Sequence, residues 1–504
     1  MKNKGLIFAL VAVLSTAFAP VLLGDEVDLV RMYSFRRGQG MWTTKPYWGG
    51  EVSWENGELV FRAAATKDGF GGKVCGLRQM QGSTPLEGRH FRITVSARGK
   101  GKLRAGFIIT SIAFNGKRRV RYAMEKDFHT LTDKSAVLSF TTDLGKESPV
   151  SIAPIVELQG EHSEARIASV RVETVRKSGV EMTSLTPLAV VPKGSTAPPR
   201  KFRFSRPGAE VRIYCFTQPK GPAKVGKRHA DSQGVVTVKF SEPLTDVAKV
   251  TAAAESAVAS SYALAIPADE YRLLEELAAK IPPAEREMHI LYLGDSLNDF
   301  DRGFNSVDIL GYFLNLRKPG SYVIHNYSVR GDYITRVEDR LKKGGDRRYR
   351  GIFDRTYDLV IIALGNNDCR ATSKTGYAEP LVAPAAARAS YERVIDELRK
   401  RSPDVPVWIL SSSYSNVEQQ IQRSDAAVKA GKLGIRFGIE GHQANFNRLL
   451  EELAAVDRTI RYIDIRTPMK ERFSPENYAD GVHLSLRGHR LFAELLLRAF
   501  LAQP

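Results

Sequence analysis

The chain has 504 residues, 43% of them hydrophobic and 26% charged, a composition typical of a globular protein, and its length predicts about two to four domains. The cysteines Cys75, Cys215 and Cys369 are odd in number and far apart, which excludes a disulfide framework or a metal-binding cysteine motif and leaves at least one free thiol. The net charge of +18 fits nucleic acid, an acidic polysaccharide or another anionic polymer as a partner, or simply a basic solvated surface.

The N-terminus has the pattern of a secretory signal peptide. Lys2 and Lys4 precede an apolar run from Gly5 to Ala19, and cleavage is expected after Ala19 or near Gly24. An uncleaved membrane anchor is the alternative, although the run is short for a membrane span. We therefore expect residues 1–24 to be a signal peptide and the mature protein to be secreted or periplasmic, with no stable membrane span. Export argues against nucleic acid as a partner.

Residues 25–178 are expected to form an all-β sandwich that could bind carbohydrate. Polar and apolar residues alternate in short segments separated by glycine-rich turns, at 58–62, 90–96, 103–110 and 166–175. Trp42, Trp48 and Trp54 lie here, with Tyr47 among them. Such rings could form a platform on which sugars stack, or they could fill the core. Basic residues cluster at 98–104, 117–121 and 342–350, where an anionic polysaccharide could bind.

Residues 179–266 are predicted to be a linker followed by a small β unit. Pro187, Pro192, Pro198 and Pro199 indicate the linker at 179–207, and alternation at 211–215 and 234–240 indicates the strands of the small unit. Helical spacing at 268–280 then opens the last domain, residues 267–504, and Pro282 ends that helix.

From residue 288 onward, strand-like and helix-like segments alternate, which predicts a parallel sheet covered by helices on both faces. The predicted strands are 288–293, 322–327, 359–364, 405–410 and 460–465. The predicted helices are 303–316, 333–343, 385–401, 442–455 and 486–501. The carboxyl ends of parallel strands share one edge of the sheet, and ligands bind there.

Polar clusters stand at that edge. The first strand ends in Gly-Asp-Ser at 294–296, the second in Asn326-Tyr-Ser-Val-Arg-Gly-Asp, and the third in Gly-Asn-Asn-Asp at 365–368. Asp-Gly-Val-His at 480–483 precedes the last helix. Each short motif is weak alone, but four of them in this order are a strong signal.

These blocks and their spacing resemble the SGNH (GDSL) hydrolase family over residues 288–501. The resemblance implies a flavodoxin-like three-layer α/β/α fold, here preceded by a jelly-roll-like β domain, and acyl transfer by a Ser-His-Asp triad. It assigns Ser296 as nucleophile, His483 as base and Asp480 as the group that orients the base. The Ser296 and Gly331 N–H groups and the Asn367 amide would form the oxyanion hole.

Other polar residues of the blocks are expected to support the site. Asp295, Asn326 and Asp368 would hold the turns. His489 is the rival base, although its place in the last helix favours packing, and neither His325 nor His442 has an evident role. The segment 411–440 is long for a loop after a strand, and loops at this edge usually govern substrate choice.

Two further residues, Asn298 and Arg330, lie beside the family's blocks and could affect the substrate pocket. Asn298 replaces the threonine or other small residue that many relatives have, which could alter the wall of the pocket. Arg330, beside Gly331, could contact an anionic substrate or be an exposed structural arginine.

The sequence therefore predicts an exported serine esterase that needs no metal and no cofactor. The favoured substrate is an acyl ester, in particular an acetyl ester, on a carbohydrate. An acyltransferase, or a lipase or lysophospholipase with the same triad, is the first alternative. A glycan-binding protein without catalytic activity is the second.

Overall fold

The computed structural model describes residues 25–35, 42–44, 48–66, 69–76, 79–80, 90–112, 118–143, 149–177, 179–217, 224–255, 257–342 and 347–502. The chain forms two compact units. The β unit comprises Met1–Pro187, Pro198–Phe240 and Val247–Ser261, and the α/β unit comprises Leu188–Ala197, Ser241–Asp246 and Tyr262–Pro504. The expected signal peptide lies outside the described residues. In the part that is described, no helix is both long and apolar enough to span a bilayer.

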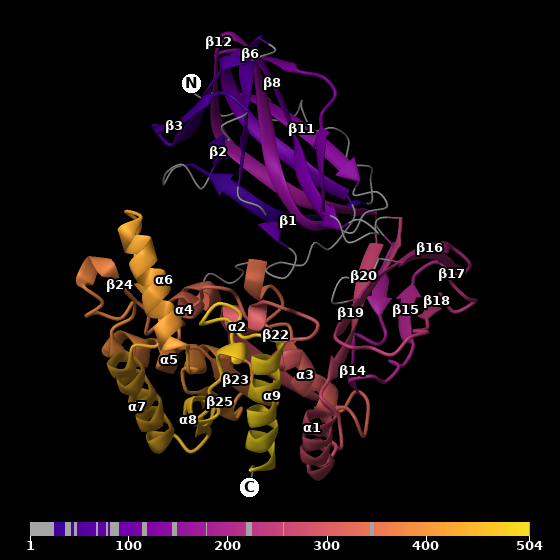
Figure 1. Ribbon diagram of the computed structural model, residues 1–504, viewed down its shortest axis with the longest axis vertical. Helices are drawn as coiled ribbons and strands as arrows, with labels where there is room; N and C mark the ends of the chain where they lie inside the picture. Colours follow the sequence, from indigo (N-terminus) through magenta and orange to yellow (C-terminus); the bar gives the residue numbers. More distant parts are fainter. Residues whose placement is uncertain are drawn as a thin grey trace, which may run out of the picture. The chain divides into compact units, whose positions relative to one another are not determined.

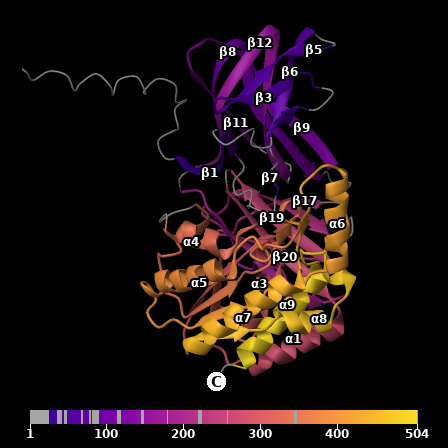
Figure 2. The ribbon, with the colours of Figure 1, turned by 90° about the vertical axis from the view of Figure 1, so that its left-hand side faces the viewer.

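The N-terminal part of the β unit is organised around two long strands. β8 (His90–Ile112) and β12 (Pro149–Lys177) pair antiparallel along most of their lengths (Figures 1 and 2). The strands that join them are β1 (Asp25–Ser34), β2 (Thr43–Thr44), β3 (Glu51–Glu55), β4 (Glu58–Arg62), β5 (Ala64–Thr66), β6 (Gly69–Cys75), β7 (Gln79–Met80), β9 (Arg118–Met124), β10 (His129–Leu131) and β11 (Ala136–Asp143). The predicted β-rich region is confirmed, and all its predicted strands fall within β4, β8 and β12. The jelly-roll topology stays a prediction.

The tryptophans of this region do not form one exposed platform. Trp42 and Trp48 are 1% and 9% exposed, and Trp42 packs edge-on against Tyr33 with ring centroids 5.4 Å apart. Trp54, in contrast, is 44% exposed, and Tyr47 lies outside the described residues. The core interpretation is therefore correct for Trp42 and Trp48, because an indole buries a large apolar area.

Part of the basic charge of the β unit is neutralised within the sheet. In the cluster 98–104, Arg98 contacts Glu58 at 2.9 Å and Arg104 contacts Glu157 at 2.7 Å. Such paired guanidinium groups attract an anionic polymer less strongly than free ones do. The clusters at 117–121 and 342–350 lie partly outside the described residues. Cys369 is a buried free thiol, which agrees with the expectation of at least one free thiol.

The segment 179–207 is not a linker, and this prediction is wrong. It contains β13 (Met182–Ser184), β14 (Leu188–Pro192) and β15 (Arg200–Phe204). β14 pairs in parallel with the end of β20 (Ala257–Ile266), and Tyr312 donates a hydrogen bond to the Val190 carbonyl at 3.1 Å. The prolines stand just before or at the ends of these strands, where a missing N–H costs little.

The small β unit after this segment is present. Its further strands are β16 (Glu210–Thr217), β17 (Lys224–His229), β18 (Val235–Val238) and β19 (Val247–Ala254). β19 and β20 come from an alanine- and serine-rich passage for which the sequence predicted no strands. Alanine has a low strand propensity, but here most of its side chains are buried between neighbouring elements.

The α/β unit contains the predicted parallel sheet, with strand order β22-β21-β23-β25-β27. In chain order this is 2-1-3-4-5, an order known from doubly wound sheets. The strands are β21 (Met288–Gly294), β22 (Tyr322–Asn326), β23 (Leu359–Ala363), β25 (Val407–Leu410) and β27 (Ile460–Ile463). A short ribbon of β24 (Ala371–Thr372) and β26 (Ile435–Arg436) lies apart from the sheet.

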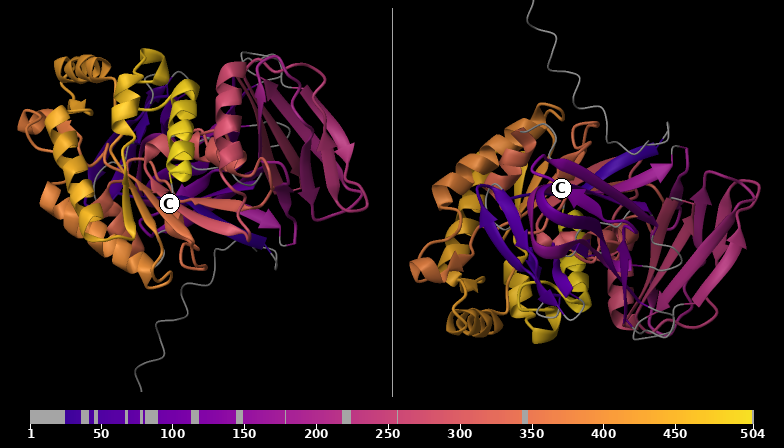
Figure 3. Two further views of the ribbon diagram at one scale, coloured as in Figure 1. Left: turned by 90° about the horizontal axis from the view of Figure 1, so that it is seen from below. Right: turned by 90° about the horizontal axis from the view of Figure 1, so that it is seen from above.

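Helices precede, connect and follow these strands; α1, α3, α4, α5, α7 and α9 match the predicted segments within a few residues, whereas α2, α6 and α8 were not predicted. They are α1 (Ala268–Lys280), α2 (Ser296–Asp299), α3 (Ser306–Leu314), α4 (Ile334–Lys342), α5 (Pro384–Arg399), α6 (Val417–Lys429), α7 (Glu440–Val456), α8 (Arg466–Glu471) and α9 (Leu486–Leu501). Figure 3 shows helices flanking the sheet of this unit. Alternate residues of β25 contact different helices. Val407 and Ile409 belong to a core cluster with residues of α5 and α7, whereas Trp408 packs on Phe500 of α9 with ring centroids 4.7 Å apart.

An ion pair between the buried Glu338 and the half-exposed Arg393 links α4 to α5 and predicts a pH-dependent stability. Glu338 accepts hydrogen bonds from Ser390 and from Arg393, both at 2.6 Å, and the bond from Arg393 is the main cause that lowers its pKa to about 2. A Glu338→Gln variant should lose about 2 kcal/mol of stability at pH 7, because a charge-assisted pair is lost. Since the folded pKa is depressed, this stabilisation exists above the unfolded pKa and disappears as pH falls toward 2.

Thermal unfolding from pH 7 down to pH 3 tests this expectation. The difference in melting temperature between wild type and variant should shrink below about pH 4.5. Glu392→Gln is the matched control, because Glu392 makes an exposed pair and should change stability by less than about 0.5 kcal/mol. A difference that stays constant over the whole range would contradict the assignment.

Candidate active site

Ser296 stands where β21 ends and α2 begins. Asp295 caps this short helix by accepting the Leu297 N–H at 2.9 Å. The preceding Gly294 allows close packing, because a Cβ at this position would lie 2.7 Å from the Ser328 hydroxyl. The turn therefore holds the Ser296 side chain at the carboxyl edge of the sheet, where it is 8% exposed.

Ser296, His483 and Asp480 form a continuous chain of hydrogen bonds. The Ser296 Oγ lies 3.0 Å from His483 Nε2, and His483 Nδ1 lies 2.8 Å from Asp480 Oδ2. Asp480 also accepts the backbone N–H of His483 at 2.9 Å. Partial burial raises the pKa of Asp480, but its hydrogen bonds with His483 outweigh this effect and hold that pKa well below the usual range. An ionised Asp480 accepts a hydrogen bond from the Nδ1–H group of His483, which keeps the proton on Nδ1 and leaves Nε2 free to accept the Ser296 hydroxyl proton.

Asn367 and Gly331 lie beside this chain. The Asn367 Nδ2 donates to Asp295 Oδ2 at 3.1 Å, and its Oδ1 accepts a bond from Arg370 at 3.2 Å. These two contacts fix which way the amide points. Gly331 has a φ of +72°, which favours glycine. In the described chain, neither the Ser296 N–H nor the Gly331 N–H has a protein acceptor.

The predicted supporting residues lie in the turns, where they accept backbone hydrogen bonds. Asp368 accepts the N–H groups of Ile334 and Gly365 at 2.9 and 3.0 Å, and Asn326 accepts the Ser328 N–H at 3.0 Å. Burial raises the pKa of Asp295 to about 6 and that of Asp368 to about 7. Asp368 is held by backbone donors, and Asp295 by the Leu297 N–H and the Asn367 amide.

The segment 411–440 was expected to be a long loop, but it contains α6. Residues of this helix hold the turn that carries Asp480. Gln420 donates to the Asp480 carbonyl at 3.1 Å, and Arg423 donates to the same carbonyl at 2.6 Å and lies 3.2 Å from the Asp480 carboxylate. The helix could have been found from its cap residue Asn416 and from Gly431, which has a φ of +69° just after its end.

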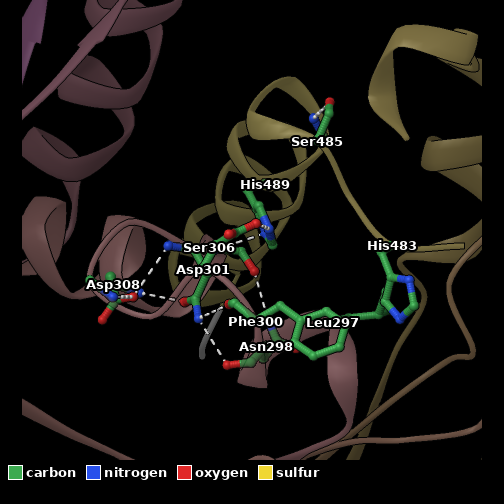
Figure 4. A network of polar contacts seen from close by, with 12 residues as sticks. Leu297, Asn298, Phe300, Asp301, Ser306, Asp308, His483, Ser485 and His489 are labelled. Atoms are coloured by element: carbon green, nitrogen blue, oxygen red, sulfur yellow. Dashed lines mark hydrogen bonds and ion pairs between the residues drawn. The ribbon is translucent and has the colours of Figure 1, made fainter. Parts of the chain in front are cut away.

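His489, the rival base, lies away from Ser296. It is 1% exposed, and its Nδ1 accepts the Ser306 N–H at 3.3 Å (Figure 4). The ring of Phe300 instead packs on His483, with centroids 4.8 Å apart, a contact that the sequence did not reveal. It restricts the orientation of the imidazole.

Asn298 does not form a pocket wall. It is 1% exposed, accepts the Tyr292 hydroxyl at 3.0 Å and donates to Ser306 at 2.6 Å (Figure 4). A threonine could make only part of this network. His325 contacts His289 at 3.0 Å, and His442 contacts the Tyr377 carbonyl at 3.1 Å. Within the described ranges, no three or more His, Cys, Asp or Glu side chains are grouped as metal ligands.

Comparisons with known proteins identify the domain. A model of the GDSL-like lipase/acylhydrolase family matches residues 292–491. Among solved structures, the chain is similar to a lipase/acylhydrolase from Enterococcus faecalis, with 19% identity, 42% of this chain and 95% of that chain covered, and a TM-score of 0.32. It is also similar to a family two carbohydrate esterase from Clostridium thermocellum (10% identity, 90% and 97% covered, TM-score 0.30) and to an acetyl xylan esterase (18% identity, 42% and 99% covered, TM-score 0.31). No curated protein matches the chain. The matched region contains both Ser296 and His483, and the protein is an ester hydrolase whose residues 292–491 form a GDSL-like lipase/acylhydrolase domain.

Proposed function

We propose that the protein is an exported serine esterase that hydrolyses an acetyl or similar acyl ester on a carbohydrate. The observation that carries the proposal is the chain of contacts from Ser296 through His483 to Asp480, at 3.0 and 2.8 Å. As the Ser296 Oγ attacks the ester carbonyl carbon, His483 Nε2 takes its proton and then gives it to the departing alcohol. Water, deprotonated by His483, next attacks the acyl-serine carbonyl; the bond to Ser296 Oγ breaks, His483 returns the proton to Oγ, and the acid leaves. Asp480 fixes the tautomer and stabilises the imidazolium.

The carbonyl oxygen becomes an anion in each step and needs donors that are already in place. The Ser296 N–H, the Gly331 N–H and the Asn367 Nδ2 group are the donors we assign. The contacts of Asn367 support its role as a donor, because its side-chain oxygen is bonded to Arg370 and one of its amide hydrogens is bonded to Asp295. The second amide hydrogen is then directed to the substrate.

An Asn367→Ala variant should therefore lose about 100- to 1000-fold in kcat, because one oxyanion donor is removed. KM should change much less, since the ground-state carbonyl carries little charge. Asn366→Ala is the matched control, because this neighbouring buried amide bonds to Ser413 instead. Steady-state kinetics on 4-nitrophenyl acetate would contradict the role of Asn367 if both variants lost the same small factor.

The polarity of the residues around Ser296 supports a carbohydrate rather than a lipid. Asn367, Arg370 and the nearby Arg336 are polar or charged, whereas a long acyl chain needs an extended apolar groove. In the β unit, Trp54 is the tryptophan whose exposure supports glycan stacking. The short segments of alternating polar and apolar residues in that unit support a jelly-roll topology. The surface arginines of the unit support an anionic polysaccharide as a partner.

We also propose the layer arrangement of the α/β domain and the export of the protein from the cytoplasm. The strand order 2-1-3-4-5 and the two sets of helices that contact β25 support a flavodoxin-like three-layer arrangement of residues 267–504. The charged and apolar pattern of residues 1–24 supports a signal peptide and export to the periplasm or the medium.

A panel of acetylated polysaccharides tests the substrate class. Purified wild type should release acetate from at least one member, and Ser296→Ala should release none above the uncatalysed rate. Long-chain 4-nitrophenyl esters serve as the lipid arm of the same assay. Activity on long-chain esters together with no acetate release from any polysaccharide would contradict the proposal and favour the lipase reading.

A further inference from the structure

Two arginines lie beside the proposed oxyanion hole, and each is bonded to one of its members. Arg370 Nη1 donates to Asn367 Oδ1 at 3.2 Å. Arg336 Nη1 donates to the Gly331 carbonyl at 3.2 Å, and its guanidinium lies 4.7 Å from the centroid of the Tyr333 ring. Two positive charges are thus bonded to residues that we assign to the oxyanion hole.

The protein neutralises these two charges only in part. Among the described residues, Arg370 has no acidic oxygen within ion-pair distance. The acid nearest to Arg336 is Asp332 at 3.9 Å, and Asp332 is already held by Arg340 at 3.0 Å. Asp368 attracts Arg370, but its two oxygens accept backbone N–H groups. Burial lowers the pKa of Arg370, and the charge of Arg336 lowers it further.

Several other arginines of this unit have a carboxylate at close range. Arg340 pairs with Asp332, Arg490 with Glu270, and Arg472 with Glu494. A half-buried guanidinium without a carboxylate is costly, because desolvation is not offset by a counterion. The cost is explained if the substrate brings the missing negative charge.

The geometry leaves donors for such a charge. A guanidinium has five N–H donors in a planar fork that matches a carboxylate. The structure shows one protein acceptor for Arg370, the Asn367 oxygen, and one hydrogen-bond acceptor for Arg336, the Gly331 carbonyl. The remaining donors are available beside the ester, so the ligand they fit is an anion within reach of the oxyanion hole.

We propose that Arg336 and Arg370 form a subsite for a carboxylate carried by the substrate close to the scissile ester. This inference rests on the proposed esterase function and narrows its substrate class to esters of acidic compounds. The carboxylate can stand on the sugar, as in acetylated hexuronic acid units, or on the acyl group. In both cases it would orient the ester carbonyl toward Asn367.

Matched substrates test the subsite with the full-length enzyme. Acetylated hexuronic acid oligomers are compared with the same oligomers after methyl esterification of their carboxylates, and 4-nitrophenyl hemisuccinate is compared with 4-nitrophenyl butyrate. Wild type should prefer the anionic member of at least one pair, by about tenfold or more in kcat/KM. In Arg336→Gln and Arg370→Gln the ratio within that pair should fall about tenfold. Because the ratio is internal to each variant, a general loss of activity does not affect it.

The control variant is Arg388→Gln, since Arg388 is a surface arginine of α5 that pairs with Glu392 and Glu452. Its ratios should equal those of wild type. If the variants lose the preference for the anionic oligomer, the carboxylate stands on the sugar. If they lose the preference for the hemisuccinate, it stands on the acyl group. Either result supports the subsite. No preference in wild type for either anionic member, or ratios that are equal in all variants, would overturn it.

A binding measurement separates this inference from the esterase proposal. Titration calorimetry of Ser296→Ala with hexuronic acid oligomers, and with succinate for the acyl case, needs no turnover. Binding to Ser296→Ala that is at least tenfold weaker in Ser296→Ala/Arg336→Gln supports the subsite even if no ester is hydrolysed. Hydrolysis of neutral esters together with no anion binding overturns the subsite and leaves the esterase proposal intact.

Discussion

Replacing Ser296 with alanine is expected to lower kcat for ester hydrolysis by roughly five orders of magnitude or more. The hydroxyl that lies 3.0 Å from His483 is the attacking atom in our account, and no acyl-enzyme can form without it. His483→Ala should lose a similar factor, because the hydroxyl is a weak nucleophile without its base. The double variant should be no slower than either single variant, since the two residues act as one unit. Steady-state and single-turnover kinetics on 4-nitrophenyl acetate measure these effects.

Two matched variants serve as controls for this expectation. Ser328→Ala removes another buried hydroxyl at the same edge of the sheet, one that has no side-chain partner within the described chain. His489→Gln removes the other histidine near the C-terminus, which bonds to the Ser306 backbone. Both should retain kcat within a small factor, although His489→Gln should lower the melting temperature. If His489→Gln lost activity as completely as His483→Ala, the choice of base would be wrong.

An Asp480→Asn variant is expected to lose about 10,000-fold in kcat. The asparagine amide would present a donor to His483 Nδ1, which favours the tautomer with its proton on Nε2. That tautomer cannot accept the Ser296 proton. Structural damage should be small, because Asn keeps the volume and an oxygen for the Val482 and His483 N–H groups, which lie 3.2 and 2.9 Å from Asp480 Oδ1.

Asp464→Asn is the matched control for this second expectation. Asp464 follows β27 directly and, like Asp480, accepts a backbone N–H, that of Thr467 at 3.1 Å, but it lies outside the Ser-His-Asp chain. Its replacement should leave kcat within a small factor of wild type. Equal activity of Asp480→Asn and Asp464→Asn, with both variants folded by circular dichroism, would show that His483 does not depend on Asp480.

The residues that we assign to the site could be picked out from the sequence because they follow strands of strong apolar pattern. β21 and β23 are buried runs, so their ends could be placed to within about one residue, and Ser296 and Asn367 follow directly. Asp480 and His483 are three residues apart, which lets one short turn bring the carboxylate to the imidazole. These short-range relations depend little on the rest of the fold.

Contacts between distant segments could not be predicted in this way. Arg423 and Gln420 reach Asp480 across about sixty positions of sequence. Residues 179–207 were misread because prolines at strand ends resemble prolines in a linker. The places of Trp42 and Trp48 could not be decided from the sequence, because tryptophan occurs both in cores and on sugar-binding surfaces.

The central claim is that Ser296 forms the covalent acyl intermediate, and active-site labelling tests it most directly. A fluorophosphonate reacts with an activated serine and leaves a stable adduct that mass spectrometry can locate. We expect one adduct per chain, on the peptide that contains Ser296, and none in Ser296→Ala or His483→Ala. Esterase activity that survives with no adduct on Ser296, or an adduct on a different serine, would contradict the account.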